Sequence, residues 1–465
     1  MSIIIPANSA VSGDYDVANS LMFNSADSAN LSRTNGGSAG SETKSTLSAW
    51  IKISSLGDDN VIFQELESSG NFFSIKLKGG DFQVNAQNNS SAFINVRTNR
   101  VLRDFSAWYH LVVAIDGTQG TSSNRIKMYI NGVQETSFST ATYPPQNQNC
   151  KINQANEVQY ISNSASSEYF NGYMSEVVWL DGQVLTPTSF GEFDEDSGIW
   201  KPIDVSGLTF GTNGFYLDFE DSSALGNDAV GSNNFTANNL AATDQGTDTC
   251  TNNFCTLTPL VRMAITLNQG NTQVTDTDSA YYGVASTMGV SSGKWYWEYK
   301  LTRIGNYAQD GVMSQLPLGN GFNDIYNTYV GSKSGGVALN TGEGKIYSAD
   351  SSTTWFGGAN SQGDIIGVAL DLDNNKIYYS ANGTFGNSSN PATNSNGYAL
   401  SATIIANKPV LPCSSINNCT LDYNFGSPYY AISSGNSDAD GHGNFEYAVP
   451  SGYFALCTKN LAEYG

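Results

Sequence analysis

The 465-residue chain is predicted to be all-β and to fold as two tandem antiparallel β-sandwiches. Short runs of alternating apolar and polar residues recur along the sequence, and turn dipeptides such as Asn-Gly and Asp-Gly separate them. The composition favours strands and turns, because it contains 47 Gly, 25 Tyr and 22 Phe but only 14% charged residues. No amphipathic stretch is long enough to predict a helix of several turns.

The first set of predicted strands lies in the first half of the chain. Residues 45–53 alternate between apolar and polar positions, which is typical of a strand with one buried face. Residues 108–115 are almost continuously apolar and predict a buried strand. Residues 125–130 lead into Asn131-Gly132, the strongest short-range signal for a hairpin. Residues 173–180 complete the set.

The second set of predicted strands begins well after the first. Residues 293–301 alternate aromatic with polar side chains, a pattern typical of strands. Residues 364–372 and 376–379 flank a short polar turn and predict a hairpin. Residues 420–426 and 452–457 supply the last strands.

The order of these elements predicts four segments. They are an N-terminal arm over residues 1–18, a first sandwich over 19–226, a polar linker over 227–260 and a second sandwich over 261–465. The arm begins with Ile3-Ile4-Ile5, which we expect to anchor the chain by adding a strand to a neighbour's sheet. Because it has neither the charged start nor the long apolar core of a signal peptide, we expect synthesis in a cytoplasm.

Charge and composition exclude several classes of partner. Lys and Arg number 21 and Asp and Glu number 42, so the net charge is −21. Such a surface repels phosphate backbones, and no basic run compensates, so nucleic acid is not expected as a partner. No apolar run reaches the roughly 18 residues of a membrane span. The 6 Cys and 2 His show no metal-ligand spacing, which argues against a structural zinc site.

Several segments resemble known families of β-sandwich. The first domain contains, in order, residues 20–24, 47–51, 106–113, 126–132 and 170–177. Together they resemble the laminin-G/pentraxin branch of the concanavalin-A-like sandwiches. The second domain is similar to SPRY-type sandwiches in its residues 293–298, 363–371, 379–383 and 421–426.

A closer likeness covers roughly residues 15–465. Three further segments carry it: residues 189–194, 213–219 and 252–260. With these, the chain is similar to virion proteins of tailed phages from aquatic environments. The resemblance implies a protein of the particle surface, in the tail-fibre, tailspike or head-decoration class.

The sequence predicts that the protein is not an enzyme. A glucanase of the concanavalin-like fold would carry a Glu-x-Asp-x-Glu pattern on one strand face, and none occurs. The nearest pattern, Glu65-Leu66-Glu67, is interpreted as a solvated strand end. His110 lies within a predicted strand and is expected to be packed, whereas His442 lies in a polar loop with neighbouring carboxylates. Neither histidine has the setting of a hydrolase base.

Metal binding is left open. Asp194-Glu195-Asp196 is interpreted as a solvated acidic loop rather than a calcium site. Asp371-x-Asp373-x-Asn375 begins like a calcium loop but lacks its later Gly and Glu, so a hairpin turn explains it better. Calcium is the cofactor considered, because laminin-G-like domains often hold this ion at one sandwich edge. No ligand set can be assigned to it from these residues.

Binding is therefore the predicted activity. Aromatic side chains in Gly- and Asn-rich loops give apolar contact area at low entropic cost, although they equally well anchor loops on a core. By contrast, the tryptophans within predicted strands (Trp50, Trp108, Trp295 and Trp297) are expected to be core residues. The candidate contact residues are Tyr326, Tyr329, Trp355, Phe356, Tyr429 and Tyr430, with Trp355 as the first choice.

These predictions combine into one main hypothesis and two alternatives. The main hypothesis is a phage surface adhesin, expected to be trimeric, that binds a host-cell glycan or protein and joins other virion proteins through its arm. One alternative is a structural protein that decorates the capsid without touching the host. The other is a glycan depolymerase of the tailspike type.

Overall fold

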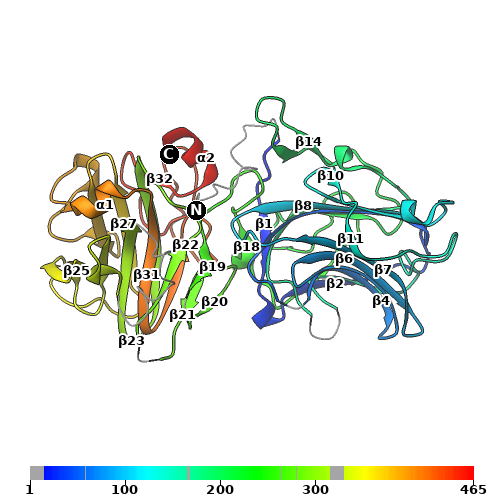
Figure 1. The fold of residues 1–465 in the computed structure, drawn as a ribbon, viewed down its shortest axis with the longest axis horizontal. Helices are drawn as coiled ribbons and strands as arrows, with labels where there is room; N and C mark the ends of the chain where they lie inside the picture. Colours follow the sequence, from blue (N-terminus) through cyan, green and yellow to red (C-terminus); the bar gives the residue numbers. More distant parts are fainter. Residues whose placement is uncertain (1–14, 58, 165–167, 263, 279, 315–328) are drawn as a thin grey trace. The chain divides into compact units, whose positions relative to one another are not determined.

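A computed structural model describes residues 15–57, 59–164, 168–262, 264–278, 280–314 and 329–465. The described chain divides into two units, with the boundary between Thr251 and Asn252 (Figure 1). Both units are antiparallel β-sandwiches, so the predicted fold class is confirmed. The α-helices of the described residues are the short α1 (Ala402–Ala406) and α2 (Thr458–Tyr464).

Two main sheets, stacked face to face, form the described part of the first unit (Figure 1). The β8 sheet contains, in spatial order, β10 (Val133–Gln134), β9 (Ile126–Ile130), β8 (Trp108–Asp116), β3 (Lys44–Ile53), β13 (Gly172–Asp181), β1 (Ser20–Phe23) and β18 (Gln245–Gly246), with β16 (Phe215–Leu217) also paired to β13. The β5 sheet contains β11 (Phe138–Thr142), β7 (Ser91–Val101), β6 (Asp81–Asn88), β5 (Asn71–Lys78), β4 (Asn60–Ser68), β12 (Val158–Ile161), β2 (Asn30–Thr34) and β17 (Thr236–Asn238). A separate pair joins β14 (Gly191–Phe193) to β15 (Trp200–Pro202).

Side chains alternate between the two faces of each strand, and those that face inward form the core between the sheets. On β5, Phe73, Ile75 and Leu77 are buried in the core, whereas Phe72, Ser74 and Lys76 point to the opposite face. The same period-2 pattern runs along β6, where Phe82, Val84 and Ala86 face inward. The outer face of the β5 sheet therefore carries polar side chains on a rigid support.

The predicted Asn-Gly hairpins are confirmed. Asn131 and Gly132 connect β9 to β10 with φ values of 48° and 78°, the positive pair that a type I′ turn requires. Asn382 and Gly383 have φ values of 47° and 78° and connect β28 to β29 in the same way.

The segment predicted as a linker, residues 227–260, is divided by the boundary between the units, which falls after Thr251. Its first part supplies β17 and β18, which pair with β2 and β1 of the first unit. Asp248 forms a buried ion pair with Lys52 of β3 at 2.6 Å. The polar composition of this segment therefore marks edge strands that the first sandwich holds.

The described part of the second unit is one connected network of strands around one large core. Its two longest strands, β23 and β31, pair along most of their length. β23 is irregular between Leu301 and Tyr307, and it pairs with β27 before this region and with β24 after it. This bend lets one strand serve both halves of the sandwich.

The remaining bounds complete this unit. The strands are β19 (Leu257–Arg262), β20 (Thr266–Asn268), β21 (Gln273–Thr275), β22 (Tyr282–Ser286), β23 (Lys294–Ser314), β24 (Gly336–Asn340), β25 (Lys345–Ser348), β26 (Ser351–Thr354), β27 (Ile365–Asp371), β28 (Lys376–Ala381), β29 (Thr384–Phe385), β30 (Tyr398–Ala399), β31 (Val410–Asn424) and β32 (Phe454–Ala455). The strand tryptophans Trp50, Trp108, Trp295 and Trp297 are all fully buried, as predicted.

Candidate functional site

The aromatic residue chosen first from the sequence lies in the core of the second unit. Trp355 is only 3% exposed, and its indole N–H donates to the carbonyl of Tyr379 at 2.8 Å. A Cβ placed on Gly386 would lie 2.4 Å from the indole ring, which shows how closely the chain packs around it. Trp355 therefore anchors its loop on the core, the structural role considered from the sequence, and presents no face to a ligand.

The other candidate aromatic residues do not gather into one pocket. Phe356 is half-buried against the same core. Tyr329 contacts the rings of its neighbours Tyr281 and Tyr347 and donates its hydroxyl to Asp350 at 2.8 Å. Tyr326 lies outside the described residues.

The pair Tyr429 and Tyr430 is also half-buried. Gln273 donates to the Tyr429 hydroxyl at 2.8 Å, and the Lys300 ammonium lies 5.5 Å from the centre of the Tyr430 ring. Both tyrosines thus hold the end of β31 through contacts within the unit.

His110 forms a hydrogen bond with a serine, but its direction is opposite to the one that catalysis would need. The Trp200 indole donates to His110 Nδ1 at 2.9 Å, so Nε2 carries the proton and donates to Ser48 Oγ at 2.8 Å. Burial lowers the pKa of His110 to about 3, and its ring stacks on Trp50. A general base must accept the proton of a serine, whereas this imidazole donates one. The expectation that His110 is packed is confirmed.

Glu65 is buried, so its interpretation as part of a solvated strand end is wrong. Its side chain is 1% exposed and points between the sheets, because inward positions alternate along β4. It accepts the backbone N–H of Asn153 at 2.8 Å and the side-chain amide of Gln159 at 2.9 Å. Arg33 donates to the same Gln159. Burial raises the pKa of Glu65 to about 7, and its hydrogen bonds tie β4, β12 and β2 together.

The acidic loops are held by internal contacts. Asp194 accepts the backbone N–H of Ser197 at 2.9 Å and pairs with Lys201 at 3.3 Å, which holds the pKa of its carboxyl at about 2. Asp371 begins the hairpin turn between β27 and β28, as predicted, and pairs with Lys294 at 3.3 Å. Within the described ranges, no group of three or more His, Cys, Asp or Glu side chains could hold a metal ion. Neither described helix is long and apolar enough to cross a membrane.

An uncharged row of hydrogen-bonding side chains crosses the outer face of the β5 sheet. Each member stands opposite its neighbours in register, so all share one face. We call this set the polar row. Its members are, in spatial order, Thr142, Asn95, Asn85, Ser74, Gln64, Tyr160, Ser32 and Thr236.

The middle of the polar row forms the floor of a groove of about 400 Å³, which we call the binding groove. It is lined by residues of β4, β5 and β6 together with Asp59, Ser69, Ser164 and Glu168. Along one side of the floor lie Phe72 and Leu66, which stand opposite each other on β5 and β4. The groove therefore offers an apolar strip beside a strip of amides and hydroxyls.

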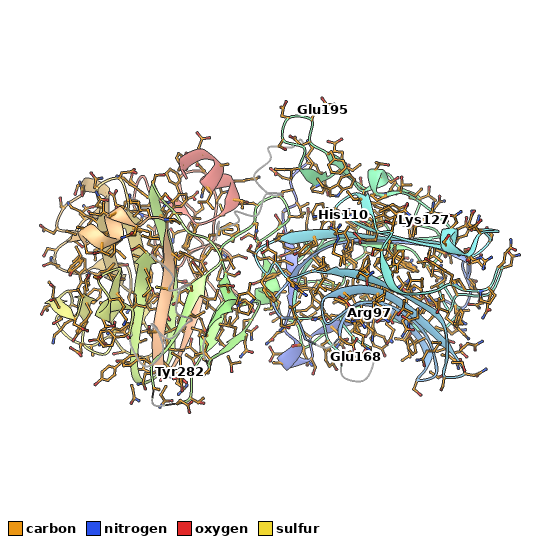
Figure 2. All side chains as sticks on the ribbon, viewed as in Figure 1. Arg97, His110, Lys127, Glu168, Glu195 and Tyr282 are labelled. Carbon is orange, nitrogen blue, oxygen red and sulfur yellow. The ribbon has the colours of Figure 1, made fainter. Side chains whose placement is uncertain are left out.

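Four charged side chains line the groove, namely Asp59, Lys76, Lys78 and Glu168, and three of them form ion pairs. Lys76 forms ion pairs with Asp59 at 2.9 Å and with Glu168 at 3.3 Å. Arg97, in the adjoining row, pairs with Asp81 at 2.7 Å. Figure 2 labels Arg97, which belongs to β7, and Glu168, which follows β12. Since two lysines and two carboxylates line the groove, the charges of its lining sum to zero, which suits an uncharged ligand.

Gln64 gives the groove an unused acceptor. Its side chain is 4% exposed, and its Oε1 is buried without a hydrogen-bond partner among the described residues. A buried amide oxygen in this state costs free energy, of the order of 1–3 kcal/mol, unless a ligand or water donates to it. Gln64 therefore brings to the groove floor an amide whose oxygen is still unpaired.

This site was not predicted from the sequence. One pattern in the sequence could have indicated it. Every second residue of β6 is an amide (Gln83, Asn85 and Gln87), whereas an ordinary exposed strand face would also carry charged residues. The groove itself is invisible in the sequence, because Gln64, Ser74 and Asn85 become neighbours only through strand pairing.

Two family models match the chain. Residues 24–189 match the model described as the concanavalin A-like lectin/glucanases superfamily. Residues 294–428 match the SPRY domain model. The chain contains a concanavalin-A-like domain and a SPRY domain. The binding groove lies within the concanavalin-A-like domain.

Solved structures similar to the chain share little sequence with it. The SPRY domain of human HERC1 is 17% identical, with 36% of this chain and 96% of that chain covered and a TM-score of 0.28. A protein from Bacteroides ovatus, proposed to bind carbohydrate, is 17% identical over 49% of this chain and 60% of its own, with a TM-score of 0.33. A heptameric SAP-like pentraxin from Limulus polyphemus is 18% identical over 37% and 80%, with a TM-score of 0.27. No curated protein matches the sequence.

Proposed function

We propose that this protein is a non-enzymatic binding protein whose concanavalin-A-like domain holds a glycan in the binding groove. The observation that carries the proposal is the polar row, with its buried, unpaired Gln64 oxygen beside an apolar strip. A sugar presents the same two surfaces, because its hydroxyls form hydrogen bonds while its C–H faces pack on apolar side chains.

The groove favours an uncharged sugar chain that runs across the strands. The polar row repeats at the strand spacing of about 4.8 Å, so successive sugars of such a chain would meet successive side chains. Because Lys76 is already paired, an acidic sugar would have to compete with Asp59 and Glu168 for it, which leaves only the exposed Lys78 as a ready partner in the groove. Binding without chemistry is supported by Glu65 and His110, which serve packing and hydrogen bonding inside the sandwich.

Replacing Gln64 or Phe72 tests the groove. We expect Gln64→Ala and Phe72→Ala each to weaken glycan binding at least tenfold, which corresponds to about 1.4 kcal/mol. The first variant removes an acceptor and the second an apolar contact, while β4 and β5 keep their core residues. Binding is measured on an array of neutral and acidic oligosaccharides and then by calorimetry with the best ligand.

Thr34→Ala is the matched control, because Thr34 is exposed on the same sheet but outside the groove. It should bind like the unmodified protein. Glycan binding that survives both groove variants would place the ligand elsewhere and overturn the assignment.

We further propose that the chain acts on the surface of a phage particle as a trimeric adhesin for a host-cell glycan or protein. The resemblance to virion proteins of tailed phages that was described from the sequence motivates this proposal, and the two domains that the family models match are of ligand-binding type. Multiple copies would turn weak contacts of each groove into firm attachment. In this arrangement residues 1–18 join the chain to other virion proteins.

A map of intact particles by cryo-electron microscopy tests this placement. We expect density for tandem sandwiches at the distal end of the tail, in a trimeric arrangement. Density spread over the head lattice would instead favour capsid decoration. Absence of the protein from purified particles would overturn the virion assignment but leave the glycan groove to be judged by its own variants.

A further inference from the structure

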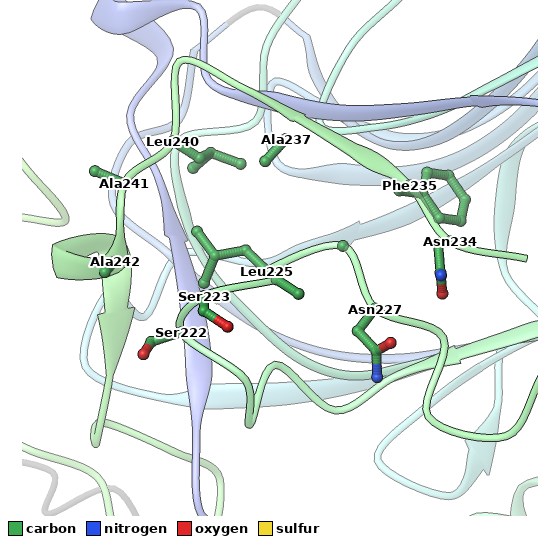
Figure 3. A pocket seen from close by; sticks show the side chains of 12 residues that line it. Ser222, Ser223, Leu225, Asn227, Asn234, Phe235, Ala237, Leu240, Ala241 and Ala242 are labelled. Atoms are coloured by element: carbon green, nitrogen blue, oxygen red, sulfur yellow. The ribbon is translucent and has the colours of Figure 1, made fainter. Parts of the chain in front are cut away.

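A second recess lies in the first unit, at the open edge between the two sheets. It has a volume of about 360 Å³ and is formed by β17, the loop of residues 222–227 and residues 240–242 (Figure 3). Ala237 of β17 lines it and stands opposite the core residue Leu31, so the recess uses the inward face of this strand. Thr236, the end of the polar row, points to the other face. The recess is thus separate from the binding groove.

The floor of the recess is apolar and small. Leu225 and Phe235 are buried at 5% and 6% exposure, and Leu240 packs beside them. Figure 3 shows these side chains around the opening. The Phe235 ring cannot turn away, because Phe215 lies edge-on against it at 4.8 Å and the Arg33 guanidinium lies 5.3 Å from its centre.

The rim of the recess is polar, uncharged and partly unused. Asn227 and Ser222 make no side-chain hydrogen bond with any described residue, and both are exposed. Asn234 accepts the backbone N–H of Asp228 through Oδ1 at 2.8 Å, while its NH₂ group has no such partner in the described chain. No charged side chain is present among the described residues that line the recess.

Both walls are fixed before any ligand arrives. The Phe235 N–H donates to the carbonyl of Gly226 at 2.7 Å, and a Cβ on Gly226 would lie 2.1 Å from the Phe235 oxygen, so only glycine permits this approach. On the other wall, Asp244 accepts the N–H of Ala241 at 2.7 Å. Gln245 donates to the carbonyl of Phe219 at 2.6 Å. A preformed recess loses little entropy on binding.

We propose that this recess binds a 2-acetamido sugar. A charged ligand would find no opposite charge on the lining, and a purely apolar one would leave the amides of Asn227 and Asn234 without partners. A plain hexose can pack a C–H face on the apolar floor, but it has no amide to pair with the asparagines of the rim. An acetamido group supplies a methyl for Leu225, Phe235 and Leu240, and an amide for the asparagines, while the sugar hydroxyls reach Ser222. The volume lies within the range of about 300–1,000 Å³ for ligand sites.

The test compares two substitutions on neighbouring residues of β17. Ala237→Trp fills the recess from an exposed position, whereas Thr236→Trp places the same side chain on the opposite face. Binding of N-acetylglucosamine and of glucose is measured by ligand-observed NMR titration on the full chain. We expect N-acetylglucosamine to bind at least tenfold more tightly than glucose, and Ala237→Trp to weaken it at least tenfold while Thr236→Trp does not.

Two further variants complete the test. Asn227→Ala, which breaks no internal hydrogen bond of its side chain, should also weaken N-acetylglucosamine binding and is informative even if Ala237→Trp fails to fold. Thr34→Ala, which lies outside both the recess and the binding groove, should leave it unchanged. Equal binding of the two sugars, or equal binding by Ala237→Trp and Thr236→Trp, would overturn the proposal.

Discussion

Raising the pH from 5 to 8 should destabilise the SPRY-containing unit, and Asp310 is expected to be the main cause. Its side chain is fully buried, accepts the hydroxyl of Tyr423, and has a pKa raised by burial to about 8. In the unfolded chain the pKa is about 3.9, so between these values the folded state holds one more proton. The free energy of unfolding then falls by about 1.4 kcal/mol for each pH unit.

Asp310→Asn replaces the titrating carboxyl group with an amide of nearly the same shape that does not titrate. Its free energy of unfolding should change much less with pH than that of the unmodified protein, as measured by urea unfolding at pH 5, 6, 7 and 8. The neighbours Tyr299, Tyr379 and Tyr423 stay neutral throughout, because burial holds the pKa of each hydroxyl well above its usual range. A wild-type curve parallel to that of Asp310→Asn would show that Asp310 is ionised in the folded protein. In the first unit, Glu65 and Glu176 act in the same direction, since burial raises the pKa of both to about 7.

Replacing Lys52 should destabilise the concanavalin-A-like domain by about 3–5 kcal/mol, because this is the usual cost of leaving one charge of a buried ion pair without its partner. Lys52 lies 2.6 Å from Asp248, and both side chains are 1% exposed. The Trp108 indole also donates to Asp248, at 3.0 Å. Lys52→Met keeps the volume of the side chain but takes the cation away from the carboxylate. Guanidinium unfolding followed by circular dichroism measures the loss.

The double variant Lys52→Met/Asp248→Asn is the control. An asparagine still accepts the Trp108 N–H but carries no charge, so the double variant should be more stable than Lys52→Met alone. A cost below about 1 kcal/mol for Lys52→Met would mean that the pair contributes no more than an exposed one. It would also weaken the view that Asp248 fastens the segment after β17 to the first sandwich.

Strand positions could be predicted because their cause is local. Residues 45–53 alternate with period 2, and the structure confirms a strand at Lys44–Ile53. Asn131-Gly132 predicted its hairpin because both residues tolerate positive φ. The strand tryptophans were correctly expected in the cores, since large aromatic side chains on alternating strands are buried when two sheets stack.

Burial in loops could not be predicted in this way. Trp355 and Tyr329 both stand in polar, Gly-rich surroundings, yet Trp355 enters the core while Tyr329 stays near the surface. The difference comes from Gly386, distant in sequence, which leaves room for the indole. In the same way, Asp248 looks like a linker residue in the sequence, whereas in the structure it forms a buried ion pair with Lys52.

The amino-acid sequence by itself determined the all-β class, the two sandwiches and the places of the main strands, because alternation and turn chemistry act over a few neighbouring residues. Only the tertiary structure decided where binding chemistry gathers. Gln64, Ser74 and Asn85 stand on three different strands, and their row exists only through the register of those pairings. The recess beside Ala237 likewise needs Leu225 and Phe235 from separate loops. Strand register and loop packing depend on contacts between distant residues, which a local pattern does not specify.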